Sequence, residues 1–248
     1  MRRTRIEHEV GHRPFPLPRE PWLLFQSWRD LLFAHWPVPV WQLRALVPES
    51  LEIDAHEGQA WVGLTPFRMV GLRPRGLPPV PRLSSFPEMN LRTYVRHRGR
   101  TGIHFFSLDA ASRLAVLGAR LSYRLPYYYA AMAAIRKDGW IAYRSHRLGT
   151  PGAELVARYR ATGPVFRPAP GSLERFLVER YALFAVPSRG TVLRAEVHHL
   201  PWELQPAEAE LTRNTVPAAH GIELPPDPPL LHFAARQDTL VWPRHRVE

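Results

Sequence analysis

Cysteine is absent from this chain of 248 residues, and lysine is nearly absent. Without cysteine the chain has no disulfide, no thiolate metal site and no cysteine nucleophile. Lysine occurs once, at Lys137, although lysine and arginine together number 33. Long apolar runs are missing too, since no stretch approaches the roughly 20 residues needed to cross a bilayer. The sequence therefore predicts no contact with a membrane interior and leaves a single lysine for amine chemistry.

Signatures of several enzyme classes are also missing. The chain has no glycine-rich phosphate loop, no G-x-S-x-G elbow and no aspartate-rich metal loop. His8-Glu9-Val10-Gly11-His12 matches the zinc-protease pattern H-E-x-x-H, but its glycine and the prolines that follow do not suit the helix which that chemistry requires. We therefore expect no metal and no cofactor. Residues 1–18 lack the apolar segment of a signal peptide, so we expect a cytoplasmic protein.

The positive charge of the chain is large but dispersed. The formal net charge is +11, and almost all of the basic residues are arginines spread along the whole length. One dense basic cluster, Arg96–Arg100, has the pattern of a hairpin tip. No aromatic-rich binding motif accompanies it, so we expect no nucleic-acid partner. The sequence does not indicate an oligomeric state.

Proline and turn residues divide the chain into a tail and one domain. Residues 1–21 are predicted to form a proline-rich N-terminal tail, and residues 22–248 a single domain. Within the domain, many short strands alternate with turn signals, which predicts an α+β, β-rich fold. We expect a mainly antiparallel sheet, curled or closed like a barrel, with a few peripheral helices. The segment Pro74–Pro87 holds five prolines and is expected to be a loop that borders the next strand.

Three helices are predicted. The first covers Val40–Val47, and the second covers Ala110–Leu121, with Asp109 as N-cap and Leu114, Leu117 and Leu121 as its apolar stripe. The third covers Leu173–Tyr181 and is capped by Ser172. Gln26–Trp36 fits a buried strand or a helix equally well. The clearer strands are Leu51–Asp54, Gln59–Phe67, Asn90–Arg96, Gly102–Leu108, Met132–Arg136, Trp140–Ser145, Glu154–Arg160, Thr191–His198 and Leu230–Trp242.

One strand carries a row of polar side chains. In a strand over residues 86–95, Glu88, Asn90, Arg92 and Tyr94 point to one face because successive side chains alternate. This row either lines a polar pocket or forms the wet face of an amphipathic strand. Closure of the sheet would give it an interior to face, which favours the pocket.

Several segments resemble the YqjF-like proteins, a family known as domain of unknown function 2071. These segments are Phe86–Val95, Phe105–Ala110, Gly118–Leu121, Leu125–Tyr128, Phe176–Tyr181, His198–Trp202 and His232–Arg236. That family is similar in turn to acetoacetate decarboxylase, a mostly antiparallel barrel-like sheet with helices around it. Leu43-Arg44, Val47-Pro48-Glu49 and Leu51-Glu52-Ile53 carry this second likeness.

The likeness to the decarboxylase implies an active-site arginine and excludes its catalytic step. Arg29 falls where the decarboxylase has an arginine, so the resemblance implies that Arg29 points into a cavity and meets a substrate carboxylate. The decarboxylase also needs a Schiff-base lysine, whose pKa a neighbouring cationic group lowers. This chain has Tyr123–Tyr128 at the corresponding place, without a lysine. Arginine stays protonated and is a poor nucleophile, so Schiff-base decarboxylation is not expected.

Three hypotheses remain for function. The first is a lyase or hydrolase acting on a small carbonyl or carboxylate compound of the oxo-acid type, with Glu88 as acid/base. Its carboxylate would be held by arginine, and phenols would donate to a developing oxyanion. The second is a barrel that binds such a small molecule without reaction, and the third is a structural protein with a filled core. The expected ligand-binding residues are Arg29, Asn90, Arg92, Tyr94, Arg120 and Tyr127.

Overall fold

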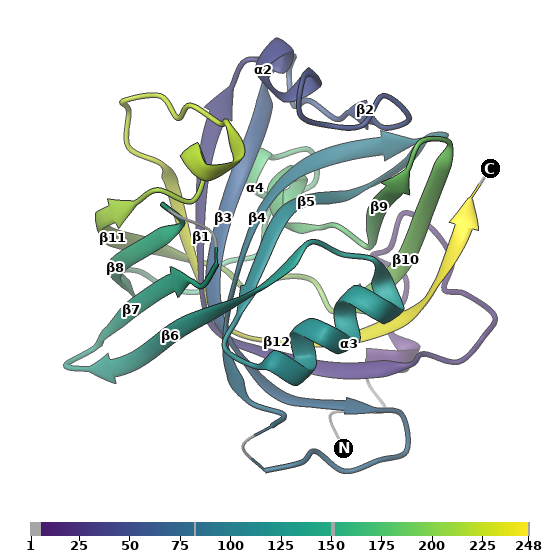
Figure 1. Cartoon of the computed structure of the whole chain (residues 1–248), viewed down its shortest axis with the longest axis horizontal. Coiled ribbons are helices and arrows are strands. Elements are labelled where there is room, and N and C mark those ends of the chain that lie inside the picture. Colours follow the sequence, from purple (N-terminus) through teal and green to yellow (C-terminus); the bar gives the residue numbers. More distant parts are fainter. Residues whose placement is uncertain (1–5, 82, 150–151, 248) are drawn as a thin grey trace.

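One large β-sheet dominates the computed structural model, which describes residues 6–81, 83–149 and 152–247 (Figure 1). The first five residues of the expected tail lie outside the described residues. In the described chain the sheet has 12 strands. They are β1 (Leu24–Val38), β2 (Glu52–Ile53), β3 (Ala60–Pro74), β4 (Phe86–His97), β5 (Arg100–Ala110), β6 (Tyr127–Lys137), β7 (Trp140–Arg147), β8 (Glu154–Ala161), β9 (Ala182–Ser188), β10 (Thr191–His199), β11 (Gln205–Asn214) and β12 (Leu230–Val247). The β-rich, mainly antiparallel fold is as predicted from the sequence.

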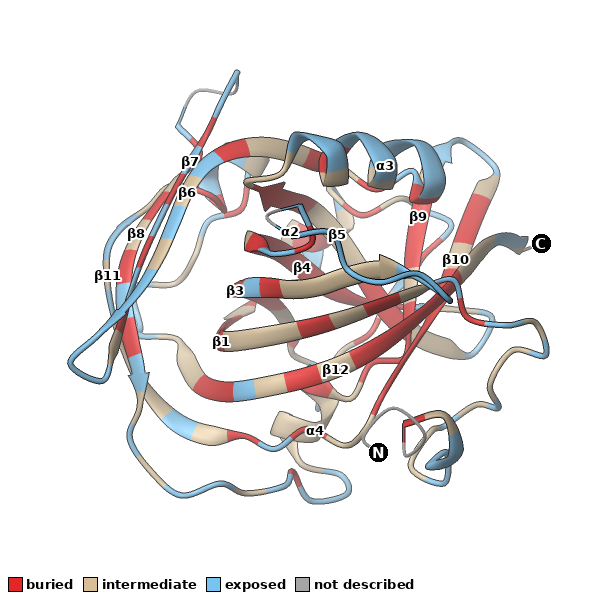
Figure 2. Ribbon diagram, turned by 90° about the horizontal axis from the view of Figure 1, so that it is seen from below, coloured by how far each residue is buried: buried red, intermediate tan, exposed pale blue. Residues whose placement is uncertain are grey.

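The strand pairings close into two rings rather than one regular barrel. Strands β12, β1, β3, β4 and β5 belong to both rings. The first ring is completed by β9 and β10, because β9 pairs with β5 and β10 pairs with β12. The second ring is completed by β6, β7, β8 and β11. Figure 2 shows these two groups on opposite sides of β1, β3 and β12.

The shared strands have a different environment on each face. On β4, Met89, Leu91 and Val95 join a packed core with Tyr143 and Leu155 of the second ring. The opposite face of β4 looks into the first ring, where other apolar residues of the shared strands gather with those of two helices. The alternation predicted for residues 86–95 is therefore present, and both of its faces are buried. The strand β4 therefore separates two interiors and has no face in contact with solvent.

Besides the helical residues 6–8 near the start of the described chain, three α-helices lie outside the sheet: α2 (Val40–Arg44), α3 (Arg113–Tyr123) and α4 (Leu173–Val178). A short 3₁₀ turn covers Ala218–His220. The helices α2 and α4 begin where predicted and end about one turn earlier. Ser172 caps α4 as expected, since its Oγ accepts a hydrogen bond from the amide of Arg175 at 3.2 Å. No helix in the described part of the chain combines the length and hydrophobicity that crossing a bilayer requires.

The prediction for α3 is wrong in two respects. Asp109 does not cap the helix: it belongs to β5, and Ser112 caps α3 by accepting a hydrogen bond from the amide of Ala115. The expected apolar stripe also faces outward, since Leu114, Leu117 and Leu121 are 62%, 56% and 62% exposed. Asp109 instead forms a buried ion pair with Arg147, whose Nε donates to Oδ1 at 2.8 Å. Burial raises the pKa of Asp109, and the hydrogen bonds and the charge of Arg147 offset part of that increase.

Two strands were not predicted. The strand β9 follows α4 directly, and β11 contains Pro206 near its start. Pro206 lies at the end of the ladder with β12, where its missing amide is tolerated. The ambiguous segment Gln26–Trp36 is a strand, within β1. The predicted strands Met132–Arg136 and Trp140–Ser145 are present as β6 and β7, and the turn between them lies at Asp138-Gly139, with both residues at positive φ.

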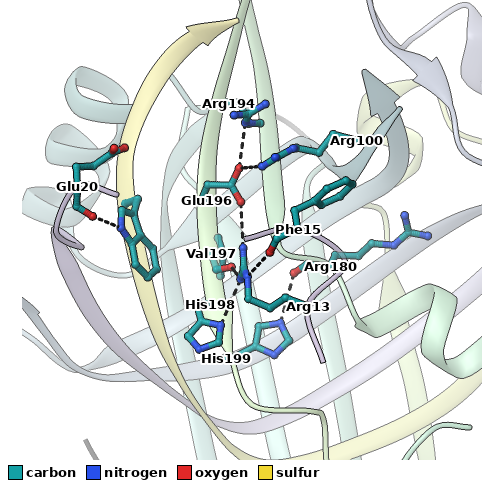
Figure 3. Close-up of polar contacts among 11 residues, drawn as sticks. Arg13, Phe15, Glu20, Arg100, Arg180, Arg194, Glu196, Val197, His198 and His199 are labelled. Carbon is teal, nitrogen blue, oxygen red and sulfur yellow. Dashed lines mark hydrogen bonds and ion pairs between the residues drawn. The ribbon is translucent and has the colours of Figure 1, made fainter. Parts of the chain in front are cut away.

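The N-terminal segment lies against the outside of β10 (Figure 3). Arg13 is buried there: its Nη2 lies 3.1 Å from Oε2 of Glu196, and its Nη1 donates to the carbonyl of Val197 at 2.6 Å. The carboxylate of Glu196 also pairs with Arg100 and Arg194, as Figure 3 shows. Three guanidinium groups thus share one buried carboxylate. These contacts anchor the start of the chain to a strand near its other end.

Candidate functional site

A cavity of about 570 Å³ lies inside the first ring. Its walls come from both ends of the chain: β1, β3, β4 and β5, then β9, β10 and β12, with α3 along one side. Residues of the loop between β3 and β4, among them Pro78, Val80 and Leu83, border it as well. The loop therefore has the position expected for Pro74–Pro87. Figure 2 shows α3 as a largely exposed helix along one side of the curled sheet.

Glu88, Asn90 and Arg92 of β4 all line this cavity. They are 3%, 7% and 7% exposed, so the row is inside the protein rather than on a wet surface. The hypothesis of a wet strand face is therefore wrong. Across the ladder, Asn90 pairs with Thr65 of β3, and Thr65 also lines the cavity. Strand alternation and sheet closure together place these polar groups in one interior.

Glu88 is held as a neutral acid in this interior. Burial raises the pKa of Glu88 to about 8, and the nearby Asp109 adds to the increase. A hydrogen bond from the hydroxyl of Tyr127, 3.0 Å from Oε1, lowers that pKa, but its effect is smaller than that of burial. At neutral pH most of Glu88 therefore carries a proton and can donate a hydrogen bond.

Arg92 is a buried cation without a carboxylate. Its guanidinium lies 5.4 Å from the ring centre of Phe33, and its Nη2 donates a long hydrogen bond of 3.5 Å to the carbonyl of Leu177. No ion pair of Arg92 occurs among the described residues, and its Nε has no hydrogen-bond partner there. Three other buried polar atoms of the cavity wall also lack partners in the described chain: Oγ1 of Thr65, Oδ1 of Asn90 and Nε1 of Trp202.

These unpartnered atoms offer both donors and acceptors to whatever fills the cavity. Unsatisfied buried polar atoms are costly, and native proteins keep few of them without a reason such as a ligand or an ordered water. Arg92 and Trp202 present N–H donors, Asn90 presents an acceptor, and Thr65 presents a hydroxyl that does both. The wall can therefore bind a ligand that carries negative charge and at least one neutral polar group. No group of three or more histidine, aspartate or glutamate residues in the described chain is placed to hold a metal ion.

Tyr94 and His35 lie behind Arg92. Tyr94 is fully buried, its hydroxyl is 2.8 Å from Nε2 of His35, and it is not among the residues that line the cavity. Burial, with the charge of Arg92 as a second cause, holds the pKa of His35 well below its ordinary value of 6.5, so His35 is neutral. Gly63 makes room for this arrangement, because a Cβ there would lie 2.9 Å from the His35 ring and 3.4 Å from Nε of Arg92. Tyr94 thus positions a neighbour of the site rather than meeting a ligand.

Arg29 and Arg120, both expected to bind a ligand, are not brought to the cavity. Arg29 donates from Nε to Oγ of Ser27 at 3.0 Å. Arg120 is exposed on α3, and its Nε donates to the carbonyl of Tyr127 at 2.6 Å. Neither arginine is among the described residues that line the cavity. Tyr127, in contrast, lines it and contacts Glu88.

Sequence reasoning missed Thr65 and Trp202. Thr65 lies in a strand that was predicted. Its place beside the polar row depends on the pairing of β3 with β4, which was not predicted from the sequence. Trp202 belongs to the segment His198–Trp202, but nothing in its sequence context indicates an unpaired indole N–H. In the structure its ring meets Phe33 edge-on at 4.9 Å, and both residues line the cavity.

Comparison with known proteins identifies both the family and the fold. Residues 25–238 match the model of the DUF2071 family, described as an uncharacterized conserved protein. The chain is 49% identical over 227 residues to the uncharacterized protein YqjF of Bacillus subtilis strain 168, an alignment that covers 92% of this chain and 93% of that protein.

Similar solved structures include acetoacetate decarboxylase-like proteins. Acetoacetate decarboxylase from Legionella pneumophila superposes with a TM-score of 0.62 at 14% identity, covering 99% of this chain and 95% of that one. The enduracididine biosynthesis enzyme MppR, complexed with pyruvate, superposes with a TM-score of 0.65 at 12% identity, covering 97% of this chain and 95% of that one. At these identities the likeness shows the fold alone. The chain therefore belongs to the DUF2071 family of YqjF-like proteins and has the acetoacetate decarboxylase-like fold.

Proposed function

We propose that the cavity binds a small organic acid that also carries a carbonyl or hydroxyl oxygen, with the carboxylate of the acid against Arg92. The observation that carries this proposal is the buried guanidinium of Arg92, which faces the cavity and has no carboxylate partner among the described residues. Burying a charge is costly unless the charge is paired, and a ligand carboxylate provides that pair. The planar guanidinium also matches the two oxygens of a carboxylate.

The other polar groups of the wall suit the remaining part of such a ligand. Glu88, neutral because burial raises its pKa to about 8, can donate a hydrogen bond to a carbonyl oxygen without repelling the carboxylate. The hydroxyl of Tyr127 holds Oε1 of Glu88 at 3.0 Å, which leaves Oε2 to carry the acid proton. Asn90 and Trp202 add an acceptor and a donor on the same wall. Pyruvate in the structurally similar MppR supports an oxo-acid as the ligand class.

Catalysis by Glu88 is the second candidate function. A carboxylic acid with a pKa near neutrality is well matched to proton transfer, and Glu88 has such a pKa inside a cavity. It would donate its proton to the oxygen of a bound carbonyl, as a lyase or hydrolase step on an oxo-acid requires. A Schiff base has no support, because Lys137 is exposed at the tip of the β6–β7 hairpin and does not line the cavity.

Isothermal titration calorimetry with pyruvate and acetoacetate tests the binding proposal. We expect binding by the wild type and a 10- to 100-fold weaker affinity for Arg92→Gln, since a hydrogen bond to a charged group contributes about 1.5–3 kcal/mol. Arg29→Gln and Arg120→Gln are matched controls, and their affinities should stay close to wild type. Loss of binding in Arg29→Gln with no loss in Arg92→Gln would transfer the carboxylate site to Arg29 and contradict the proposal.

Proton NMR of the same acids tests the catalytic candidate. Turnover by the wild type that disappears in Glu88→Gln, with binding retained, would establish Glu88 as the proton donor. Binding without turnover across a panel of oxo-acids would favour a binding protein. If none of these acids binds, the unpaired groups serve another ligand or only the structure, and the proposal fails.

A further inference from the structure

The cavity is long, and its two ends differ in chemistry. Four residues of β4 line it at alternate positions, from Phe86 through Glu88 and Asn90 to Arg92. Six residue steps along a strand correspond to about 20 Å. A cavity lined over this length can hold an extended molecule.

Polar groups are concentrated at the Arg92 end of this line. Next to Arg92 the ladder places Asn90 opposite Thr65, and both have unpartnered polar atoms. Glu88 follows, opposite Phe67. From that point the wall of the cavity along these two strands becomes apolar.

The opposite end of the line is mainly apolar. Phe86 pairs with Met69 across the ladder, and both line the cavity. Beyond them Leu72, Val80 and Leu83 continue the lining into the loop between β3 and β4. Val80 and Leu83 are 53% and 48% exposed, so this end reaches the protein surface. A ligand with its acid group at Arg92 would therefore cover exposed apolar side chains with its other end.

The volume of the cavity is larger than a short oxo-acid needs. A cavity of about 150 Å³ is enough for benzene, whereas this one measures about 570 Å³. A three- or four-carbon acid at Arg92 would leave the apolar end unfilled. Apolar walls gain stability when apolar ligand surface covers them.

We infer that the cavity takes an amphipathic monocarboxylic acid with an unbranched aliphatic tail, which lies along β3 and β4 from Arg92 towards Leu72 and Val80. This inference rests on the proposed function, since it uses the same carboxylate contact. It narrows the ligand class: the acid proposed above has a tail of medium chain length, and pyruvate and acetoacetate are its short analogues. The aliphatic tail carries much of the affinity, and the acid group sets the orientation.

Calorimetric titration with butyrate, hexanoate, octanoate and decanoate tests the inference. We expect the affinity to increase about fourfold for each added methylene, because burying one methylene contributes about 0.8 kcal/mol. Arg92→Gln should weaken every acid of the series by a similar factor and leave the dependence on chain length intact. A flat series, in which butyrate binds through Arg92 and octanoate binds no better, overturns the inference and leaves the proposed function standing. Absence of binding for every acid, the oxo-acids included, overturns the proposed function itself.

Two tryptophan variants at the apolar end test where the tail lies. Leu72→Trp should reduce octanoate affinity at least tenfold and spare butyrate, because the larger ring fills the tail end of the cavity. Leu77→Trp is the matched control: Leu77 is exposed in the loop that follows β3 and does not line the cavity, so the affinities of this variant should equal those of the wild type. Val80→Trp, at a half-exposed position that tolerates substitution, gives the same test if Leu72→Trp does not fold. Unchanged octanoate affinity in a folded Leu72→Trp or Val80→Trp variant contradicts the assigned position of the tail.

Discussion

The buried acid Glu88 should make the stability of the protein depend on pH in a way that one substitution removes. Burial raises its pKa from the ordinary 4.5 to about 8. The folded chain therefore holds more protons than the unfolded chain between these values, and stability falls as the pH rises from 4.5 to 8. At about 1.4 kcal/mol for each pH unit, the whole effect is about 5 kcal/mol. Roughly 3 kcal/mol of it is lost between pH 6 and pH 9.

Glu88→Gln isolates this effect because the amide stays neutral at every pH. Its Oε1 can still accept the hydrogen bond from the hydroxyl of Tyr127. We expect the variant and the wild type to have similar free energies of unfolding at pH 5–6. At pH 9 the variant should be more stable than the wild type by about 3 kcal/mol. At that pH folding of the wild type must either bury a charged carboxylate or take up a proton from a basic solution, and both cost free energy.

Urea denaturation followed by tryptophan fluorescence, repeated from pH 5 to pH 9, measures the difference. Glu210→Gln is the control, since Glu210 is exposed and pairs with Arg158 on the surface. Its stability profile should run parallel to that of the wild type over this range. Parallel profiles for the wild type and Glu88→Gln would refute the reasoning, because they would mean that the carboxyl group is solvated or paired in the folded protein.

Three further predictions concern other parts of the structure. Asp109→Asn should lower the free energy of unfolding by about 3–5 kcal/mol, measured by urea denaturation, because it leaves Arg147 as a buried charge without its partner. Adding Arg147→Met should recover part of that loss. An unchanged midpoint for Asp109→Asn would contradict this role of the pair. Gly63→Ala should destabilise the fold by about 1–3 kcal/mol, since its Cβ would lie 2.9 Å from the ring of His35; a crystal structure of the variant with an unmoved His35 ring would count against the close packing. Borohydride treatment with acetoacetate should leave no adduct by mass spectrometry, and an adduct at Lys137 would reopen Schiff-base chemistry.

The fold was predictable from the sequence because its local signals agree with its topology. The alternation of residues 86–95 correctly predicted that the polar row and the pair Met89 and Leu91 lie on opposite faces of β4. Both faces are buried, so the polar residues follow the cavity and the apolar residues follow the packed core. The hairpin at Asp138-Gly139 carried its own turn chemistry. Such signals act over a few residues, which is why they can be read without knowing the neighbouring strands.

The errors came from contacts between distant segments. Asp109 was assigned to a helix terminus, and nothing nearby in the sequence indicates that Arg147 would hold it within a strand. The leucine stripe of α3 was expected to face the core, but its three leucines are exposed, and of the three Leu114 alone borders the cavity. Arg29 was placed in a cavity by resemblance, whereas in this chain its guanidinium donates a hydrogen bond to Ser27 in the same strand. The unpaired atoms of Thr65 and Trp202 could be recognised only once all partners were known.

The sharing of five strands between two rings has a consequence for how the cavity wall can change. On β4, neighbouring residues belong to different interiors. Glu88, Asn90 and Arg92 face the cavity, whereas Met89 and Leu91 face the packed core. A substitution at a cavity-facing position can therefore alter the cavity wall while the residues on either side of it preserve the core. An insertion or deletion of one residue in β4 would exchange the two sets and harm both interiors at once. The cavity wall can therefore change by single substitutions in β4, whereas a change in the length of this strand would disturb both interiors.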